Sequence, residues 1–202
     1  CMEIHNEVEK SGLLEREIAV ANCVINTYCK CGCLLKAQEV FDKLPIRDVV
    51  TWTTLITGYA EQMDGNEALR CFEQMQHEGV FADALTFASC LKACGSVGAT
   101  SKGMEIHVKL ETNGLMGIDY VLSTSLVDMY GKCGLLAKAQ EAFDNLQIKD
   151  VVAWNTIISG YVLHGCGMDA FCKFQQMQAE GIMPDITTLL SILKMCSLTS
   201  AL

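Results

Sequence analysis

The chain has 202 residues, of which half are hydrophobic and 7% are aromatic, and its net charge is −9. This composition supports a sizeable buried core and excludes a disordered chain. No apolar run approaches the roughly 18 residues of a membrane span, so we expect no membrane interaction. Proteins that hold nucleic acid through its phosphates are usually basic. Any interaction with nucleic acid must therefore rest on base contacts.

The start of the chain and its twelve cysteines bear on its cellular setting. The first residue is Cys1 and not Met, so we expect the natural start, and any targeting segment with it, to be missing. No basic start followed by a short apolar core marks a signal peptide. Most cysteines lie among small apolar residues, where a free thiol behaves as a small hydrophobe. We therefore predict free thiols and an intracellular protein, with a disulfide scaffold as the alternative.

The sequence is internally duplicated. Cys1–His5 recurs as Gly103–His107, and Lys30–Gly32 recurs as Lys132–Gly134. The offset is 102 residues each time, without insertion or deletion, and about 43 of 100 aligned positions are identical. Such self-similarity indicates a duplication of whole structural units.

Each long period contains three smaller units, and each unit has the pattern of a helix pair. In Val49–Asp83 the first apolar face follows i, i+3, i+4 and i+7 spacing through Trp52, Leu55, Ile56 and Tyr59. Asp64-Gly65-Asn66 then predicts a break. A second apolar face follows at Ala68, Leu69, Phe72 and Met75. We expect this second helix to end at Glu78-Gly79, because glycine suits a helix C-cap.

The same pattern divides the whole chain. The complete units have lengths of 31, 35, 36, 31 and 35 residues: Ile18–Asp48, Val49–Asp83, Ala84–Asp119, Tyr120–Asp150 and Val151–Asp185. Half-units remain at 1–17 and 186–202. No strand-like alternation competes with this interpretation, so we predict an all-α protein. A single helix pair cannot bury its own apolar face, whereas stacked pairs bury a continuous core.

Several segments carry a resemblance to a known family. Val49–Tyr59 and Val151–Tyr161 resemble the opening of a pentatricopeptide repeat, and Phe72–Met75 and Phe174–Met177 resemble its second helix. Gly181–Asp185 resembles its closing turn. The tetratricopeptide pattern, Trp-x-x-Leu-Gly-x-x-Tyr with a closing Pro, is absent. The resemblance covers essentially the whole chain and implies a right-handed superhelical solenoid of antiparallel helix-turn-helix repeats.

The unequal unit lengths resemble the plant organellar subclass that alternates standard, long and short repeats. Leu91–Cys94 with Gly103–His107 resembles its long repeat, and Asp128–Gly134 its short one. The implied array comprises the second half of a long repeat (1–17), a short (18–48), a standard (49–83), a long (84–119), a short (120–150) and a standard repeat (151–185), and the first helix of a long one (186–202).

In this family one repeat reads one RNA base, and the resemblance assigns the reading to the fifth and last residues of each unit. These pairs are Asn22 with Asp48, Thr53 with Asp83, Thr124 with Asp150, and Asn155 with Asp185. An Asp carboxylate suits a base that carries an N–H. By the family's code Asn with Asp favours uracil and Thr with Asp favours guanine, which implies 5′-U-G-n-G-U-3′. The middle base is blank, because the long unit offers Ala88 with Asp119.

The second residue of each unit is expected, by the same resemblance, to pack on base faces. These residues are Ala19, Val50, Val121 and Val152, with Leu85 in the long unit. Ala19 is small for this task. The simpler alternative is that Asn and Thr are helix caps, that Asp forms turns, and that Val packs within the protein. Four polar pairs at one phase favour RNA reading.

Two other motifs do not support a chemical site. Cys29, Cys31 and Cys33 lack the C-x₂₋₄-C pair of structural zinc sites, and only one of them persists in the second copy, as Cys133. His5-Asn6-Glu7 matches half of a nucleobase-deaminase signature, but no P-C-x-x-C follows. We therefore expect no metal, no cofactor and no catalysis.

The sequence thus predicts a sequence-specific adaptor for single-stranded RNA. The resemblance implies a chloroplast or mitochondrial location and a role in RNA processing or in selecting sites for C-to-U editing. The deaminase-like domain would act in trans or belong to a C-terminal region that this chain lacks. The alternative is a tetratricopeptide-like scaffold for protein–protein interaction, which the acidic charge would suit if it held basic peptides.

Overall fold

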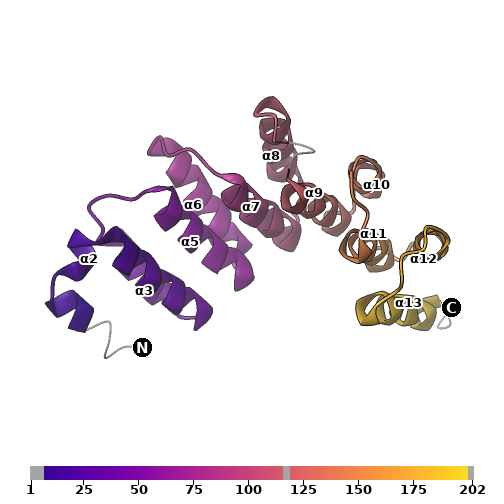
Figure 1. Ribbon diagram of the computed structural model, residues 1–202, viewed down its shortest axis with the longest axis horizontal. Coiled ribbons are helices and arrows are strands. Elements are labelled where there is room, and N and C mark those ends of the chain that lie inside the picture. Colours follow the sequence, from indigo (N-terminus) through magenta and orange to yellow (C-terminus); the bar gives the residue numbers. More distant parts are fainter. Residues whose placement is uncertain (1–6, 116–118, 200–202) are drawn as a thin grey trace. The chain divides into compact units, whose positions relative to one another are not determined.

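The computed structural model describes residues 7–115 and 119–199, and within these ranges the chain is helical without any strand (Figure 1). The all-α prediction is therefore confirmed. The chain forms two compact units, Cys1–Ala93 and Cys94–Leu202, which are considered separately below. In the described ranges no helix has both the length and the apolar character needed to cross a membrane.

The first unit consists of helix pairs joined by tight turns. It contains α2 (Leu13–Arg16), α3 (Ile18–Lys30), α4 (Leu34–Asp42), α5 (Val49–Glu61), α6 (Gly65–His77) and the first ten residues of α7 (Ala84–Val97). Helix α3 packs on α4, and α5 packs on α6. The first helices of the two pairs, α3 and α5, lie side by side (Figure 1).

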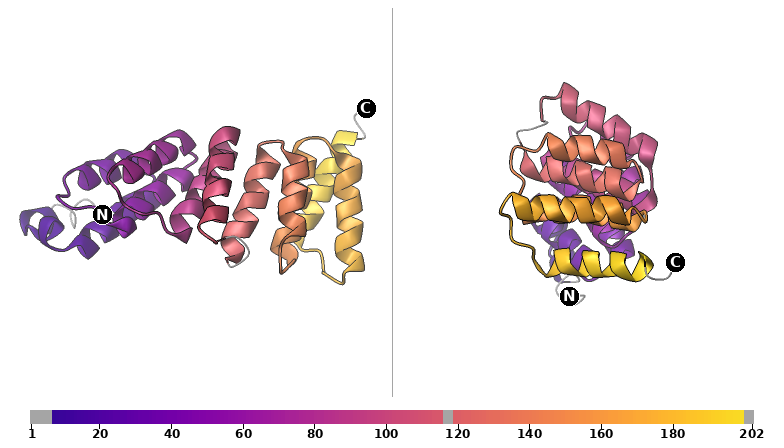
Figure 2. Two further views of the ribbon diagram at one scale, coloured as in Figure 1. Left: turned by 90° about the horizontal axis from the view of Figure 1, so that it is seen from above. Right: turned by 90° about the vertical axis from the view of Figure 1, so that its right-hand side faces the viewer.

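The second unit repeats this arrangement. It contains the end of α7, then α8 (Thr100–Thr112), α9 (Tyr120–Lys132), α10 (Leu136–Asp144), α11 (Val151–Leu163), α12 (Gly167–Ala179) and α13 (Ile186–Thr199). Here α9 pairs with α10 and α11 with α12, while α11 packs between α9 and α13 (Figure 2). In both units, first helices therefore form one row and second helices another.

An aspartate fixes the start of most first helices. Asp48, Asp119 and Asp150 are the N-caps of α5, α9 and α11, and the side chain of each accepts a backbone N–H from the first turn. Asp83 and Asp185 do the same for α7 and α13. This capping satisfies donors that the helix leaves unpaired. Each capped helix consequently begins at the residue that opens a predicted repeat.

The predicted apolar faces form the core. Trp52, Leu55 and Ile56 are fully buried in the first unit, as is Phe72 on the second helix of the same pair. The Trp52 ring meets Phe41 edge to face, with ring centroids 4.6 Å apart. In the second copy Trp154 and Phe143 repeat this contact at 4.7 Å. Burial of these large rings supplies much of the driving force for stacking the helix pairs.

The predicted break at Asp64-Gly65-Asn66 lies too late in the chain. Helix α6 already begins at Gly65, because the Asp64 side chain caps it by accepting the Glu67 N–H. The chain reverses just before, where Met63 adopts a positive φ of 63°. Its counterpart in the second copy is Gly165, at φ 72°. The predicted end of the second helix is confirmed: α6 ends at His77, and Gly79 takes a φ of 74°.

Small residues allow neighbouring first helices to approach closely. A Cβ added at Gly160 would lie 3.2 Å from the Cα of Gly131, so α9 and α11 nearly touch along their backbones. In the first unit the equivalent contact pairs Gly58 with Cys29, whose side chain fills the space beside the glycine. Burial raises the pKa of the Cys29 thiol to about 11.

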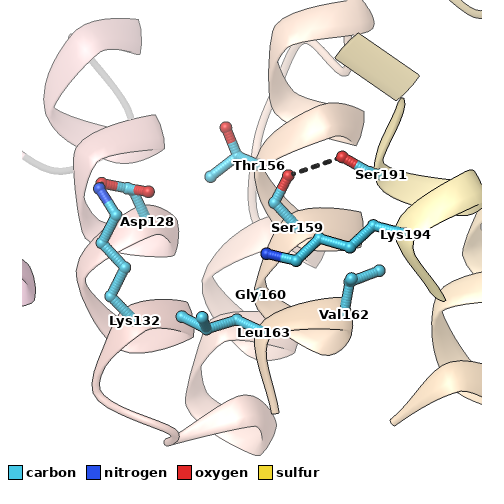
Figure 3. A pocket seen from close by; sticks show the side chains of 9 residues that line it. All are labelled: Asp128, Lys132, Thr156, Ser159, Gly160, Val162, Leu163, Ser191 and Lys194. Atoms are coloured by element: carbon cyan, nitrogen blue, oxygen red, sulfur yellow. Dashed lines mark hydrogen bonds and ion pairs between the residues drawn. The ribbon is translucent and has the colours of Figure 1, made fainter. Parts of the chain in front are cut away.

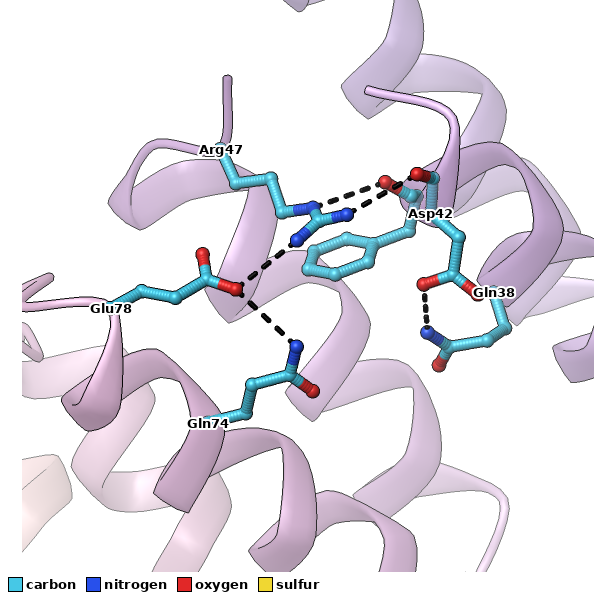
Figure 4. Close-up of polar contacts among 6 residues, drawn as sticks. Gln38, Asp42, Arg47, Gln74 and Glu78 are labelled. Atoms are coloured by element: carbon cyan, nitrogen blue, oxygen red, sulfur yellow. Dashed lines mark hydrogen bonds and ion pairs between the residues drawn. The ribbon is translucent and has the colours of Figure 1, made fainter. Parts of the chain in front are cut away.

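The turn before Asp48 is held on the second-helix side by Arg47 (Figure 4). Its guanidinium donates to the carbonyl oxygens of Phe41 and Asp42, at 3.3 and 3.2 Å, and to Glu78 Oε1 at 3.1 Å. It also lies 4.8 Å from the centre of the Phe41 ring. Arg47 therefore ties the end of α4 to the end of α6 and fixes the approach to the capping aspartate.

The cysteines and the histidine motif form no metal site in the part of the chain that the structure describes. All eleven cysteines in the described ranges are free thiols, and no cluster of His, Cys, Asp or Glu there could hold a metal ion. His5 and Asn6 lie outside the described residues. His107, the counterpart of His5, is half-buried on α8, with Nδ1 2.8 Å from the Tyr130 hydroxyl. His107 therefore packs against Tyr130, with its ring edge to face at a centroid distance of 5.7 Å.

Candidate nucleic-acid interface

A groove of about 670 Å³ runs along the row of first helices in the first unit. It lies between α3 and α5, and it brings together both reading pairs and all three packing residues predicted for this part of the chain. Its walls include Ala19, Asn22, Asp48, Val50, Thr53, Asp83, Leu85 and Lys30. Residues up to 66 positions apart in the sequence thus share one surface because the helix pairs repeat in register.

Asn22 and Asp48 both line this groove, but they differ in their hydrogen bonding. The Asp48 carboxylate is engaged, since Oδ1 accepts the backbone N–H and the hydroxyl of Thr51, each at 2.8 Å. The amide oxygen of Asn22, in contrast, is buried and has no hydrogen-bond partner among the described residues. A buried acceptor without a donor costs free energy and is uncommon in native proteins. Asn22 lines the groove, so a rotation of its amide would turn this acceptor toward a ligand there.

Thr53 and Asp83 are linked through a third residue. The Thr53 hydroxyl, which is 4% exposed, lies 2.6 Å from the Thr86 hydroxyl. Thr86 in turn donates its backbone N–H and its hydroxyl to Asp83 Oδ1, at 2.8 and 2.6 Å. The fifth residue of one repeat and the capping aspartate of the next are thus joined by a hydroxyl on the following helix.

Asn155 and Asp185 form the most complete arrangement. Asn155 Nδ2 donates to Asp185 Oδ1 at 2.9 Å, and the Thr188 hydroxyl lies 2.5 Å from Asn155 Oδ1 and 2.9 Å from Asp185 Oδ1. The Thr188 backbone N–H, together with the Asn155 amide, holds the pKa of the Asp185 carboxyl below its ordinary value. The carboxylate therefore stays charged at neutral pH.

Thr124 and Asp150 form one predicted reading pair, but each makes its hydrogen bonds to other residues. The Thr124 hydroxyl donates to the carbonyl oxygens of its own helix, at Tyr120 and Val121. Asp150 Oδ1 accepts the Ala153 N–H at 3.0 Å and the Tyr120 hydroxyl. Burial alone would raise the pKa of Asp150, but these hydrogen bonds outweigh it and lower the pKa.

Sequence reasoning missed the hydroxyl donors. Thr51, Thr86 and Thr188 each stand three residues after a capping aspartate, and this Asp-x-x-Thr spacing is a readable capping signal. The role of Tyr120 had no such signal, because it lies 30 positions before its partner Asp150.

The residues expected to pack on base faces form an exposed apolar series in the first turn of the first helices. Val50 is 51% exposed, Val121 57% and Val152 54%. Leu85 and Ala19 are exposed as well. Isolated exposed apolar side chains are ordinary, but within each unit they recur at one repeat position, where they can pack against flat apolar faces.

Lysines lie on the same row of first helices in the second unit (Figure 3). A cavity of about 200 Å³ is lined by residues of α9, α11 and α13, including Lys132, Ser159 and Lys194. Lys132 Nζ is 2.6 Å from Asp128 Oδ2, while the ammonium of Lys194 extends over α11. Lys30, at the position equivalent to Lys132, lines the groove of the first unit. In each unit, therefore, lysines line a hollow among the first helices.

Stacked helix pairs, a polar pair at nearly every repeat and an apolar series beside it define a helical-repeat protein with a modular binding face. Sequence comparison identifies the family. The model of the PPR repeat family matches residues 47–96 and 149–197, and that of the PPR repeat matches residues 20–49 and 121–151. The chain belongs to the pentatricopeptide repeat family.

Its relatives are longer plant proteins of the same family. A pentatricopeptide repeat-containing protein of Arabidopsis thaliana is 37% identical over 98% of this chain and 24% of its own length. A chloroplastic one from the same plant is 39% identical over 98% of the chain and 24% of its length. A mitochondrial one is 35% identical over 96% and 31%, respectively. The chain thus spans about a quarter to a third of these relatives.

Solved structures support the same fold. The pentatricopeptide repeat protein PPR10, in complex with an 18-nt psaJ RNA element, matches with a TM-score of 0.74 at 19% identity, over 94% of this chain and 29% of that protein. PPR10 from maize without RNA gives a TM-score of 0.71 over 89% of the chain and 28% of that protein. At this identity the similarity establishes the helical solenoid fold.

Proposed function

We propose that this chain binds single-stranded RNA and reads it one base per repeat, with 5′-U-G-n-G-U-3′ as the preferred sequence. The pairs Asn22/Asp48, Thr53/Asp83, Thr124/Asp150 and Asn155/Asp185 read the bases. Ala19, Val50, Val121 and Val152 pack on base faces. The family, and the RNA bound to PPR10 in a structure of the same fold, support RNA as the ligand.

The unpaired amide oxygen of Asn22 carries this proposal. It belongs to a residue in the wall of the groove of the first unit, which Asp48 and the exposed side chains of Ala19 and Val50 also line. A base that offers an N–H on its Watson–Crick edge supplies the missing donor, while its faces cover the apolar side chains. Uracil N3–H has this character. Peptide ligands offer N–H groups too, but not a flat face that fits between successive apolar residues.

The energetics are compatible with an acidic protein. A good base contact is worth about 1–3 kcal/mol of discrimination, and base stacking contributes a similar amount per base. Four reading positions therefore supply specificity without a strongly basic groove. Three lysines line hollows among the first helices, where they can attract the RNA phosphates locally: Lys30, Lys132 and Lys194. Because the net charge is −9, we expect these five units alone to bind RNA weakly.

The repeat lengths favour the subclass of alternating short, standard and long repeats. Within it, we propose that the chain is part of an organellar factor for RNA processing or for selecting C-to-U editing sites. Mitochondrial and chloroplastic names among the relatives support an organellar location. A deaminase domain, supplied by a longer form of the chain or by a partner, would perform the editing chemistry.

A titration tests this function directly. We expect U-G-A-G-U RNA to bind the 202-residue chain more tightly at low salt than the same oligonucleotide with G and U exchanged. Equal affinity for both would refute the base assignments. Failure to bind either RNA, combined with binding of basic peptides, would refute RNA binding and favour the protein–protein scaffold.

A further inference from the structure

The two internal copies supply a hydroxyl donor to one reading aspartate from different positions. In the first copy Asp48 receives the hydroxyl of Thr51, and the repeat opens with Ile18. In the second copy the equivalent of Thr51 is Ala153, which has no hydroxyl, and the equivalent of Ile18 is Tyr120. The Tyr120 hydroxyl donates to Asp150. One donor is lost and another is gained at the same carboxylate.

A hydroxyl reaches the same carboxylate oxygen in all four reading positions. Thr51, Thr86 and Thr188 donate to Oδ1 of the aspartate three residues before them, at 2.8, 2.6 and 2.9 Å. Tyr120 approaches Oδ1 of Asp150 from a different helix position, at the start of α9. Each Oδ1 also accepts a backbone N–H from the helix that its aspartate caps. Two different side chains therefore supply one function.

The consequence lies in the orientation of the carboxylate. A single backbone N–H leaves the group free to rotate about its terminal bond, because that torsion is broad. A second donor on Oδ1 fixes the carboxylate plane, and Oδ2 accepts none of these bonds. Oδ2 is then the oxygen available to an N–H of a base. A fixed acceptor discriminates between bases better than a mobile one, because less entropy is lost on binding.

We propose that Tyr120 is a specificity-determining positioning residue for the fourth base of the site, and that it acts by orienting Asp150. This inference rests on the proposed RNA-reading function. Tyr120 itself does not need to touch RNA. Its counterpart elsewhere is the threonine hydroxyl, so either donor serves if it reaches Oδ1.

The test removes the Tyr120 hydroxyl and then restores a donor from the other side. Tyr120→Phe keeps the ring, and Tyr120→Phe with Ala153→Thr introduces the threonine that the first copy uses. Ala153 and Thr51 are both fully buried at equivalent places, so the substitution introduces a side chain that the first copy already accommodates at this position. Tyr161→Phe is the matched control, because it removes a hydroxyl bonded to Gln140 on the second-helix side.

The measurement is the ratio of Kd values for RNAs that differ only at the fourth base, U-G-A-A-U over U-G-A-G-U. We expect Tyr120→Phe to lower this ratio roughly threefold to tenfold, as the net contribution of one typical intramolecular hydrogen bond implies. The ratio at the second base, read by Thr53 and Asp83 in the other unit, should not change. The double variant should recover the fourth-base ratio, and Tyr161→Phe should leave it unaltered.

The outcomes separate this inference from the function on which it rests. If the unmodified chain shows no base preference, the proposed function fails. If it prefers guanine at the fourth base and Tyr120→Phe keeps that preference, only the role of Tyr120 is refuted. A uniform fall at the second and fourth bases, or no recovery in the double variant, would show that Tyr120 is structural.

Discussion

Replacing Thr53 with Asn should convert the second reading position from guanine to uracil. The structure provides the template, because Thr53, Asp83 and Thr86 of the first copy correspond to Asn155, Asp185 and Thr188 of the second. In the second copy Asn155 contacts both partners, at 2.9 Å to Asp185 and 2.5 Å to Thr188. The partners of the introduced asparagine side chain are thus already in place.

The magnitudes follow from these contacts. A changed base contact is worth about 1–3 kcal/mol, or about 5-fold to 150-fold in relative affinity. The larger side chain replaces a residue that is 4% exposed, but the equivalent Asn155 is accommodated at 8%. We therefore expect a loss of stability below about 1.5 kcal/mol, within the range of tolerated core substitutions.

Fluorescence anisotropy with labelled U-G-A-G-U and U-U-A-G-U RNA measures the exchange. The Kd ratio between these RNAs should invert in Thr53→Asn, and the preference at the other positions should persist. Asn155→Thr provides the reciprocal variant, with a shift from uracil to guanine at the fifth base. An unchanged ratio accompanied by a uniform loss of affinity would refute the reading role and leave Thr53 with a structural one.

Three further predictions concern stability and reactivity. Gly160→Ala should lower the free energy of unfolding by about 1–3 kcal/mol in urea titrations, because the new methyl would press on the Gly131 backbone at 3.2 Å. The lowered pKa of Asp185 stabilises the fold above the ordinary carboxyl pKa of about 3.9, and this contribution is lost as pH falls through the native pKa. Asp185→Asn should therefore lose less stability than the unmodified chain between neutral pH and about pH 3; an equal loss would contradict this. Burial raises the pKa of the Cys71 thiol to about 12, so iodoacetamide should modify exposed Cys172 and spare Cys71 until the chain unfolds, as mass spectrometry would reveal.

The helices were predictable because their signals are local. Trp52, Leu55 and Ile56 recur at helical spacing, and the structure buries all three. The aspartate before most first helices is a capping signal that can be read without knowing the fold. The turn before α6 was placed too late because Asp64-Gly65 has turn character in isolation, while the structure uses Asp64 as a cap and Gly65 as the first helical residue.

The contacts of the candidate site were less predictable because they depend on packing between helices. Phase in the repeat brought Asn155 and Asp185 together correctly, and the structure joins them by a hydrogen bond. The same phase gave no indication that Thr124 would donate to its own helix. Nor did it reveal that Tyr120 would reach Asp150, since this requires an aromatic side chain to span the start of two stacked helices.

The acidic charge of the chain is consistent with the reading chemistry proposed for it. Asp48 and Asp83 place carboxylates beside the groove of the first unit, and Asp150 and Asp185 hold the equivalent positions in the second; such carboxylates repel the phosphates of any RNA. An RNA whose bases present N–H groups to these carboxylates recovers that cost through hydrogen bonds, whereas a mismatched RNA keeps the repulsion. Discrimination by an unfavourable term against wrong partners is a general route to specificity. On the proposed function, lower affinity and higher selectivity therefore have the same physical origin. When a reading aspartate is replaced by alanine, the repulsion of mismatched RNA and the preference for matched RNA should both decrease.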